Sequence, residues 1–282
     1  MLTSRFTICV VIGFLNNDAE SEILTLDMLP YQPNVLKASL GEDTYSILQF
    51  KLGYGYNHQF SRNNLQLNNG DNTFTEIGMF ADVYATDWSW APVLMDFDHD
   101  GYKDLFISNG IPRRMNDIDY VNFRANNDLR WKQNSNNLED QDLSLVDKMP
   151  QIKLKNKFFL NGTDLTFEDL DGRIKNDKPS YSNGAVYADF DNDGDLDVVV
   201  NNIEDMPFIY QNISPKAPES AFVNVELEGS EQNVQGIGAS LIAFKGKEIL
   251  TKEHYLIKGY QSSHAPGLHL GVGNPRKIDS LL

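Results

Sequence analysis

The stretch Asp96-Phe-Asp-His-Asp-Gly-Tyr-Lys-Asp104 recurs as Asp189-Phe-Asp-Asn-Asp-Gly-Asp-Leu-Asp197, and these two stretches decide the fold. In each one, carboxylates occupy positions 1, 3, 5 and 9, and the glycine at position 6 permits a sharp turn. Short runs of strand-forming residues precede and follow both. Four carboxylates this close would repel one another without a cation, and calcium prefers such a set of oxygen ligands. The sequence therefore predicts two calcium-binding loops, each joining two β-strands.

The spacing of the acidic residues assigns a ligand set to each predicted ion. The first Ca²⁺ is expected to bind Asp96, Asp98, Asp100, the backbone carbonyl of Tyr102 and Asp104. The second is expected to bind Asp189, Asp191, Asp193, the backbone carbonyl of Asp195 and Asp197. An EF-hand would have glutamate at position 12 and helical flanks, so these loops are not EF-hands. His99 occupies a position that supplies no ligand and is expected to face solvent.

The two loops belong to an internal repeat, because a second motif keeps the same offset. Thr73-Phe74 and Thr166-Phe167 are 93 residues apart, and so are Asp96 and Asp189. Each repeat is predicted to contain a hairpin, a connection, a strand, the metal loop and a second strand. This length is about twice a propeller blade of roughly 40 to 50 residues.

The excess length is assigned to an insertion of about residues 111–157, which is poor in strand-forming residues. Asp117 to Lys132 is predicted to be helical, and Glu139 to Met149 to form a second short helix. A weaker copy of the loop lies upstream at residues 14–22, with Phe14 at the first ligand position and Ala19 in place of the glycine. This copy is expected to be degenerate or truncated and to bind metal poorly.

The N-terminal residues allow two interpretations. Arg5 precedes an apolar run from Phe6 to Leu15, which fits either the core of a secretion signal or a buried β-strand. Residues 1–19 are therefore either a signal peptide or a truncated repeat. The run is too short to span a bilayer, and we expect no transmembrane segment elsewhere.

Composition and motif content exclude several classes of function. The chain of 282 residues has 24 basic and 40 acidic side chains, a formal charge of −16, which disfavours nucleic-acid binding and suits divalent cations. Its single cysteine, Cys9, excludes an intramolecular disulfide. No serine-hydrolase, zinc-protease or phosphate-binding motif is present, and the histidines are scattered. The aspartates of the loops are all needed by the ions, so the protein is expected not to be an enzyme.

The C-terminal part reads as a separate β-module after a linker, Ser214-Pro-Lys-Ala-Pro218. Strands are predicted at Phe222–Leu227, Ala239–Phe244 and Glu253–Ile257. The expected domains are thus residues 1–212, the repeat region, and residues 213–282, a small β-domain.

The repeats resemble the FG-GAP or VCBS-type blades of calcium-binding β-propellers, which also occur in integrin α-subunits. The tail resembles the ASPIC/UnbV domain of bacterial surface proteins and of cartilage acidic protein. The second resemblance rests on Gly236-Ile-Gly-Ala239, Gly259-Tyr-Gln-Ser-Ser263 and Leu268-His-Leu-Gly-Val-Gly273. Phrases such as Thr25-Leu-Asp-Met-Leu-Pro30 are similar to those of long Bacteroidetes proteins.

The resemblance implies an all-β fold: a partial, calcium-stabilised propeller with a helical insertion, followed by a small β-domain. Too few blades for closure and an early end of the tail suggest a fragment or a shortened member, with the ASPIC/UnbV-like domain truncated. Sheet edges left exposed by an incomplete propeller would allow association.

The same resemblance implies an extracellular or surface-exposed protein of a bacterial outer envelope. Its expected role is binding or adhesion to a glycan or protein partner. The alternatives are a structural component of an envelope assembly and a metal-dependent hydrolase. Trp88 and Trp90 fit either stacking on a sugar or packing beside the β-core.

Overall fold

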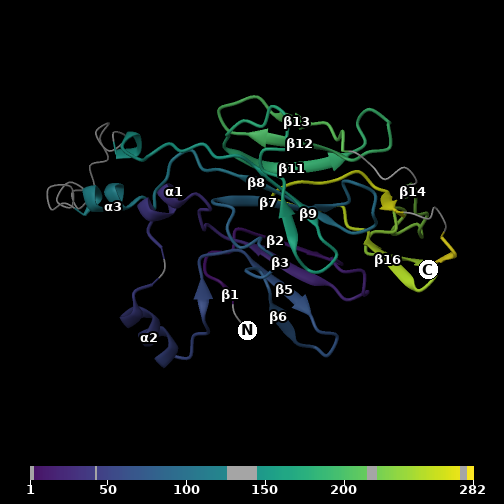
Figure 1. Cartoon of the computed structure of the whole chain (residues 1–282), viewed down its shortest axis with the longest axis horizontal. Coiled ribbons are helices and arrows are strands. Elements are labelled where there is room, and N and C mark those ends of the chain that lie inside the picture. Colours follow the sequence, from purple (N-terminus) through teal and green to yellow (C-terminus); the bar gives the residue numbers. More distant parts are fainter. Residues whose placement is uncertain (1–2, 42, 126–144, 215–220, 274–277) are drawn as a thin grey trace.

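The computed structural model describes residues 3–41, 43–125, 145–214, 221–273 and 278–282. Within these ranges the chain is built mainly of β-sheet with three short helices, as the predicted all-β class requires (Figure 1). Three sheets stack in a row and, in the described part of the chain, do not close into a barrel or a complete propeller.

The three stacked sheets share one antiparallel plan, in which strands follow one another across the sheet in chain order. The first sheet contains β2 (Cys9–Gly13), β3 (Glu22–Leu26), β5 (Asn64–Asn68) and β6 (Phe74–Glu76). The second contains β7 (Ser89–Met95), β8 (Asp104–Asn109), β9 (Lys157–Asn161) and β10 (Phe167–Asp169). The third contains β11 (Ser182–Ala188), β12 (Asp197–Asn202) and β13 (Phe208–Tyr210).

The first two strands of each sheet are joined by one of the acidic loops or by its degenerate copy. The structural unit therefore starts at the strand before the loop, whereas the predicted repeat started one hairpin earlier. The β5–β6 hairpin, predicted to belong with the loop at Asp96, pairs instead with β3 of the preceding sheet. A repeat read from sequence has an arbitrary starting point, and hydrogen bonding between strands sets the real boundary.

Alternation of side chains along β7 and β8 gives the middle sheet two apolar faces. Leu94, Leu105 and Ile107 join the core shared with the first sheet. Val93, Met95 and Phe106 join the core shared with the third. Burial of both faces explains why these strands carry apolar residues without a polar side.

Two long connections leave the sheets at the same place, between the second and third strands. The first, residues 27–63, contains α1 (Pro33–Ala38), α2 (Tyr45–Gly53) and β4 (Gln59–Phe60), which pairs in parallel with β1 (Thr3–Ser4). The second, residues 110–156, contains α3 (Ile118–Arg124), capped by Asp117. The connections touch each other through a bridge between Ser39 and Asp117.

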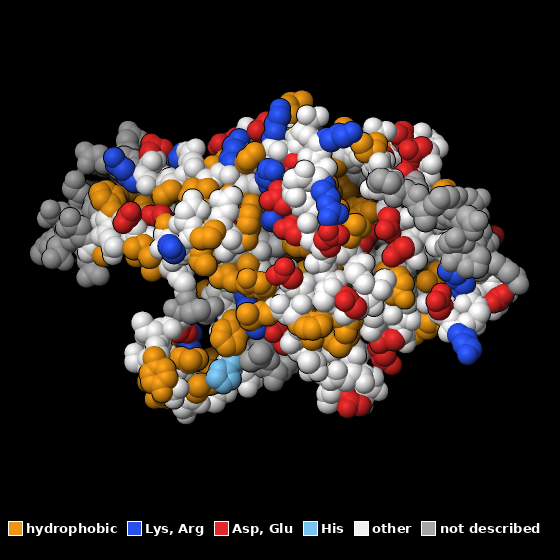
Figure 2. All heavy atoms as spheres, viewed as in Figure 1, with side chains coloured by type: hydrophobic (Ala, Val, Ile, Leu, Met, Phe, Trp, Pro, Cys, Tyr) orange, Lys and Arg blue, Asp and Glu red, His pale blue; other side chains and the backbone are white. Residues whose placement is uncertain are grey.

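The predicted insertion is thus one of two long connections, and the connection at residues 27–63 was not predicted. α3 confirms the start of the helix expected at Asp117, whereas residues 126–132 of that prediction lie outside the described ranges. The helix expected at Glu139–Met149 is described only from residue 145, where residues 145–147 are helical and a turn follows at Lys148. α1 and α2 were not predicted. α2 buries none of its residues, and apolar side chains gather over it in Figure 2.

The strands after residue 221 pair only with one another in the described part of the chain, around their own apolar cluster. β14 (Phe222–Val225) pairs with β17 (Leu268–Gly271), and β15 (Ser240–Lys245) pairs with β16 (Glu248–Glu253) and β18 (Ser280–Leu281). The strand predicted at Glu253–Ile257 was wrong: it lies earlier, at β16, because a turn at Gly246 folds it directly back on β15. We call residues 221–282 the tail.

The apolar run Phe6–Leu15 contains β2, the first strand of a full four-stranded sheet. The upstream copy is therefore degenerate in its loop and not truncated in its sheet. Among the described residues, none of the helices has the length and apolar character needed to cross a membrane.

Candidate metal centres

Both acidic loops have the same backbone conformation. His99 and Asn192 at position 4 adopt left-handed φ values of 62° and 60°. Gly101 and Gly194 at position 6 have φ values of 96° and 92°. Glycine adopts this region without strain, which is why the motif requires it at the turn.

Carboxylates of each loop accept hydrogen bonds from its own backbone, in the same pattern. Position 1 accepts from the glycine: Asp96 from Gly101 N at 2.9 Å, and Asp189 from Gly194 N at 3.0 Å. Position 5 accepts from position 7: Asp100 from Tyr102 N, and Asp193 from Asp195 N. These hydrogen bonds hold the backbone of each loop around its carboxylates without an ion.

The structure brings together part of each predicted ligand set. Asp96, Asp98 and Asp104 each place a carboxylate oxygen within 4.8 Å of the others, and so do Asp189, Asp191 and Asp193. Asp100 lies outside the first group, and Asp197 lies outside the second. The backbone carbonyls of Tyr102 and Asp195 remain predicted ligands.

Asp104 and Asp197 at position 9 have a further role that the motif did not reveal. Asp104 accepts from Phe97 N at 2.6 Å and from Asn161 N at 2.9 Å. Asp197 accepts from Phe190 N at 3.3 Å and from Asn212 N at 2.8 Å. Each of these carboxylates thus ties its loop to the end of the third strand of the same sheet.

The electrostatics of the first loop favour a cation. Burial, and then repulsion by Asp100 and Asp98, raise the pKa of Asp96 to about 7. Burial also raises the pKa of Asp104 well above its usual range, and that of Asp100 to about 6. Among the described residues, the buried Oδ1 of Asp96 has no hydrogen-bond partner. A buried carboxylate oxygen of this kind, beside other carboxylates, fits calcium and would be neutralised by it.

The degenerate copy keeps the loop geometry but loses the first carboxylate. Asn17 and Ala19 have the same left-handed conformations, with φ values of 58° and 67°. Glu22, equivalent to Asp104, accepts from Leu15 N at 2.7 Å. Phe14 replaces the aspartate of position 1, and the ammonium of Lys103 bonds to its carbonyl at 2.7 Å. The described residues therefore place a protein cation, Lys103, beside this loop.

The tail lies directly on the loops, which the sequence did not indicate. On the first loop, Gly273 N donates to His99 O at 2.8 Å. Gly271 packs so closely that a Cβ there would lie 1.9 Å from Asp96 Oδ2. On the second loop, Phe222 packs on Gly194, and a ring nitrogen of His269 lies 3.0 Å from Gly194 O. In the sequence, the glycines of the motif Leu268–Gly273 were the feature that could have indicated this close contact.

His99 was wrongly expected to face solvent. Its side chain is buried against the stacked rings of Phe222 and His269, whose centroids lie 5.2 and 5.0 Å away. Its Nε2 lies 3.9 Å from Oδ1 of Asp195 in the second loop. The tail and the two loops thus form one buried junction. The first loop is more buried than the second, since Asp191 and Asp193 are exposed.

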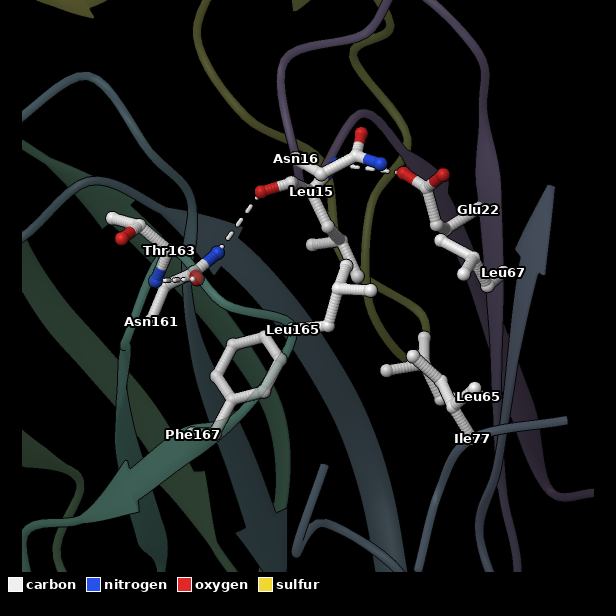
Figure 3. A pocket seen from close by; sticks show the side chains of 10 residues that line it. All are labelled: Leu15, Asn16, Glu22, Leu65, Leu67, Ile77, Asn161, Thr163, Leu165 and Phe167. Atoms are coloured by element: carbon white, nitrogen blue, oxygen red, sulfur yellow. Dashed lines mark hydrogen bonds between the residues drawn. The ribbon is translucent and has the colours of Figure 1, made fainter. Parts of the chain in front are cut away.

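Neighbouring sheets are joined by asparagines at the loop ends. Figure 3 shows Asn161 of β9 beside the degenerate loop: its amide nitrogen donates to Leu15 O at 3.0 Å. The same nitrogen donates to Lys103 O in its own sheet. Asn212 repeats this one sheet further on, by donating to Phe97 O at 2.8 Å.

The fold and these loops define a class: an all-β repeat protein whose acidic loops are covered by a second β-unit. Residues 53–107 match the family model of the FG-GAP-like repeat, and residues 229–282 match that of ASPIC and UnbV. The chain therefore carries an FG-GAP-like repeat and a C-terminal ASPIC/UnbV domain, as the sequence motifs indicated. Residues 53–107 run from the end of α2 through the β5–β6 hairpin and the first loop into β8, so the family model, like the sequence repeat, places that hairpin before the loop. No curated protein matches the chain.

Proposed function

We propose that this chain is a non-enzymatic, calcium-binding repeat module of an extracellular or cell-surface protein, in which two Ca²⁺ ions hold the tail on the repeat region. FG-GAP-like repeats are typical of extracellular proteins, which supports the location. The three sheets would be blades of a calcium-stabilised β-propeller. Their common strand order and face-to-face packing support this arrangement.

The observation that carries the proposal is the burial of acidic loops beneath the tail. Asp96 and Asp104 are almost inaccessible to solvent, and the tail contacts the backbone of both loops. Burying several carboxylates without neutralisation is costly, because each loses its hydration. A divalent ion in each loop would remove that cost and make the covered arrangement stable.

Calorimetric titration of the metal-free protein with CaCl₂ tests the sites. We expect two ions per chain, because the degenerate loop lacks the first carboxylate. Asp98→Asn and Asp191→Asn should each remove one ion. Asp71→Asn and Asp164→Asn are matched controls: these aspartates lie in surface turns, also 93 residues apart, and accept hydrogen bonds from the threonines of those turns. Titrations showing no calcium binding would refute the proposal.

Thermal unfolding tests the consequence for stability. At calcium concentrations about 100 times the dissociation constant, one site adds roughly 2.7 kcal/mol to the free energy of unfolding. For a chain of this size that corresponds to a rise of about 5 to 10 °C in melting temperature. EDTA should therefore lower the melting temperature, and the two asparagine variants should respond less than the wild type does.

One observation favours a structural role in a larger assembly as a second candidate. Val10 and Ile12 on β2 are 48 % and 58 % exposed, whereas Val11 between them is buried in the first core. A second sheet packing on this face would cover both. Analytical ultracentrifugation of the wild type and of Ile12→Lys decides it: self-association that the variant abolishes supports assembly, and a monomer at all concentrations opposes it.

A further inference from the structure

Where the tail crosses the inner strands of the second and third sheets, it leaves an open groove of about 680 Å³. We call it the junction groove. One wall comes from Trp90 on β7 and from β11 and β12, and the other is the tail segment Tyr260–Ser263. This volume lies within the range of about 300 to 1,000 Å³ that is usual for small-ligand sites.

We propose that the junction groove binds a neutral saccharide. The inference rests on the proposed function, since it names the ligand class of the same binding module. It differs from the calcium sites in place and in chemistry.

The first argument is charge. Of the twelve described residues that line the groove, none is Asp, Glu, Lys, Arg or His. The whole chain is 23 % charged and carries a net charge of −16, so a lining of this size without charge is unusual for this surface. Phosphates, sulfates, metal ions and charged peptides would find no opposite charge there.

The second argument is the kind of polar group present. Five lining side chains are aliphatic amides or hydroxyls: Asn183, Asn201, Gln261, Ser262 and Ser263. Such groups both donate and accept hydrogen bonds, as sugar hydroxyls do. Asn201, Gln261 and Ser263 are exposed, so they can reach a ligand.

The third argument is the pair of aromatic rings in the lining. The rings of Trp90 and Tyr260 lie 4.8 Å apart, tilted at 56°, and both line the groove while only partly buried. Aromatic rings supply a rigid apolar surface at low entropic cost, suited to the C–H faces of a sugar. Trp88, the other tryptophan considered for stacking, is 8 % exposed and packs in the protein interior.

The tail segment is held in a special conformation at this place. Gly259 and Gln261 adopt φ values of 74° and 46°, and Ser262 Oγ bonds to Tyr260 O at 2.7 Å. Gly184 of β11 provides room, since a Cβ there would lie 2.9 Å from Ser262 Oγ. Backbone strain of this kind at an exposed glutamine favours a functional explanation over one from stability.

One side of the junction groove belongs to the tail, and the tail rests on the two acidic loops. Saccharide affinity should therefore depend on calcium, because release of the tail would open the groove. This dependence distinguishes the junction groove from a site formed by the repeats alone.

The test uses the whole chain in saturating CaCl₂ on an array of neutral oligosaccharides: glucans, mannans, xylans and galactans. Polygalacturonate oligomers and neutral peptides serve as comparison probes. Calorimetry then measures affinity for the neutral probes that bind. We expect at least one neutral oligosaccharide to bind, and EDTA to weaken its binding.

Variants locate the binding. Gln261→Gly removes the amide and suits the left-handed backbone, so it should fold normally and still bind less tightly. Tyr260→Ala should raise the dissociation constant about tenfold, in line with the loss of one aromatic contact. Tyr255→Ala is the matched control, because Tyr255 is an exposed tail tyrosine that does not line the groove.

The proposal is overturned if no neutral oligosaccharide binds, if only acidic oligosaccharides or peptides bind, or if Gln261→Gly and Tyr260→Ala bind as the wild type does. Failure of the calcium proposal is recognised separately. Calorimetry with CaCl₂ would then show no ion bound, whatever the saccharides do.

Discussion

The amide nitrogen of Asn161 lies 3.0 Å from the carbonyl oxygen of Leu15, although 146 residues separate them. Asn161 also binds its own loop, through Lys103 O and through the Asp104 carboxylate. One side chain and its backbone therefore join the second sheet to the first and fix the end of the metal loop. The pair Asn212 and Phe97 does the same between the third sheet and the second.

Asn161→Ala should destabilise the protein by about 1 to 3 kcal/mol, because it leaves two partly buried carbonyls without their donor. Asn68→Ala is the matched control. Asn68 occupies the equivalent position in the first sheet, and its amide nitrogen makes longer hydrogen bonds to Glu20 and Ser21, at 3.3 and 3.4 Å. Urea unfolding in saturating calcium measures both, and equal effects would contradict a role in joining sheets.

Gly271→Ala should separate the tail from the first loop. The added Cβ would lie 1.9 Å from Asp96 Oδ2 and 2.7 Å from the His99 Cα, and the latter cannot move without the loop. We expect faster proteolysis between the repeats and the tail and weaker calcium binding. Gly53→Ala is the control, since a Cβ there meets nothing within 4 Å. A variant that keeps wild-type calcium affinity would show that the tail does not depend on this contact.

Calcium should leave the two loops at different rates. The first loop is buried under Gly271 and Gly273, whereas Asp191 and Asp193 of the second are exposed. Release into a fluorescent chelator in stopped flow should show a slow and a fast phase. Asp98→Asn should remove the slow phase and Asp191→Asn the fast one. The reverse assignment would contradict the covered position of the first loop.

The buried ion pair between Arg114 and Asp87 should be costly to break. The two side chains lie 2.6 Å apart and are 1 % and 0 % exposed. Arg114→Met would leave a buried carboxylate without its partner, at a cost of about 3 to 5 kcal/mol. The double variant Arg114→Met with Asp87→Asn should recover part of this loss. Chemical denaturation of all three proteins measures the effect, and an additive double variant would argue against direct pairing.

The free energy of unfolding should fall as the pH is lowered, because the buried His264 resists protonation in the folded state. Burial, then the charge of Lys258, lower its pKa from the ordinary 6.5 to about 4. The unfolded chain then binds more protons between about pH 4 and 6.5, so stability is lost as pH falls through that window. His264→Gln should remove on the order of 2 kcal/mol of the loss at pH 5. Urea unfolding of both proteins from pH 7 to 4 measures it, and parallel curves would contradict the assignment.

Local chemistry made several features predictable. Glycine and aspartate at fixed offsets specify the loop conformation through contacts within nine residues, so both loops were found in sequence. Asp117 likewise marked the start of α3, because a helix cap is a contact between neighbours. The strands beside the loops followed from their apolar runs.

Features that depend on distant partners were missed. His99 was expected in solvent, yet Phe222 and His269 from the tail bury it. The boundary of each sheet was misplaced by one hairpin, because β5 pairs with β3 rather than with β7. α2 gave no amphipathic signal, since it packs no face on the core.

The acidic loops, their 93-residue register and the all-β class could be read from the sequence, because they depend on backbone conformation and on residues close together in the chain. The position of the tail over both loops, the joining of the sheets by Asn161 and Asn212, and the contact between Tyr260 and Trp90 in the junction groove arise from tertiary packing. Such contacts join distant segments of the chain: Asn161 and Leu15 are 146 residues apart, and Trp90 and Tyr260 are 170 apart. They form only once burial of the three apolar cores has brought the sheets and the tail together.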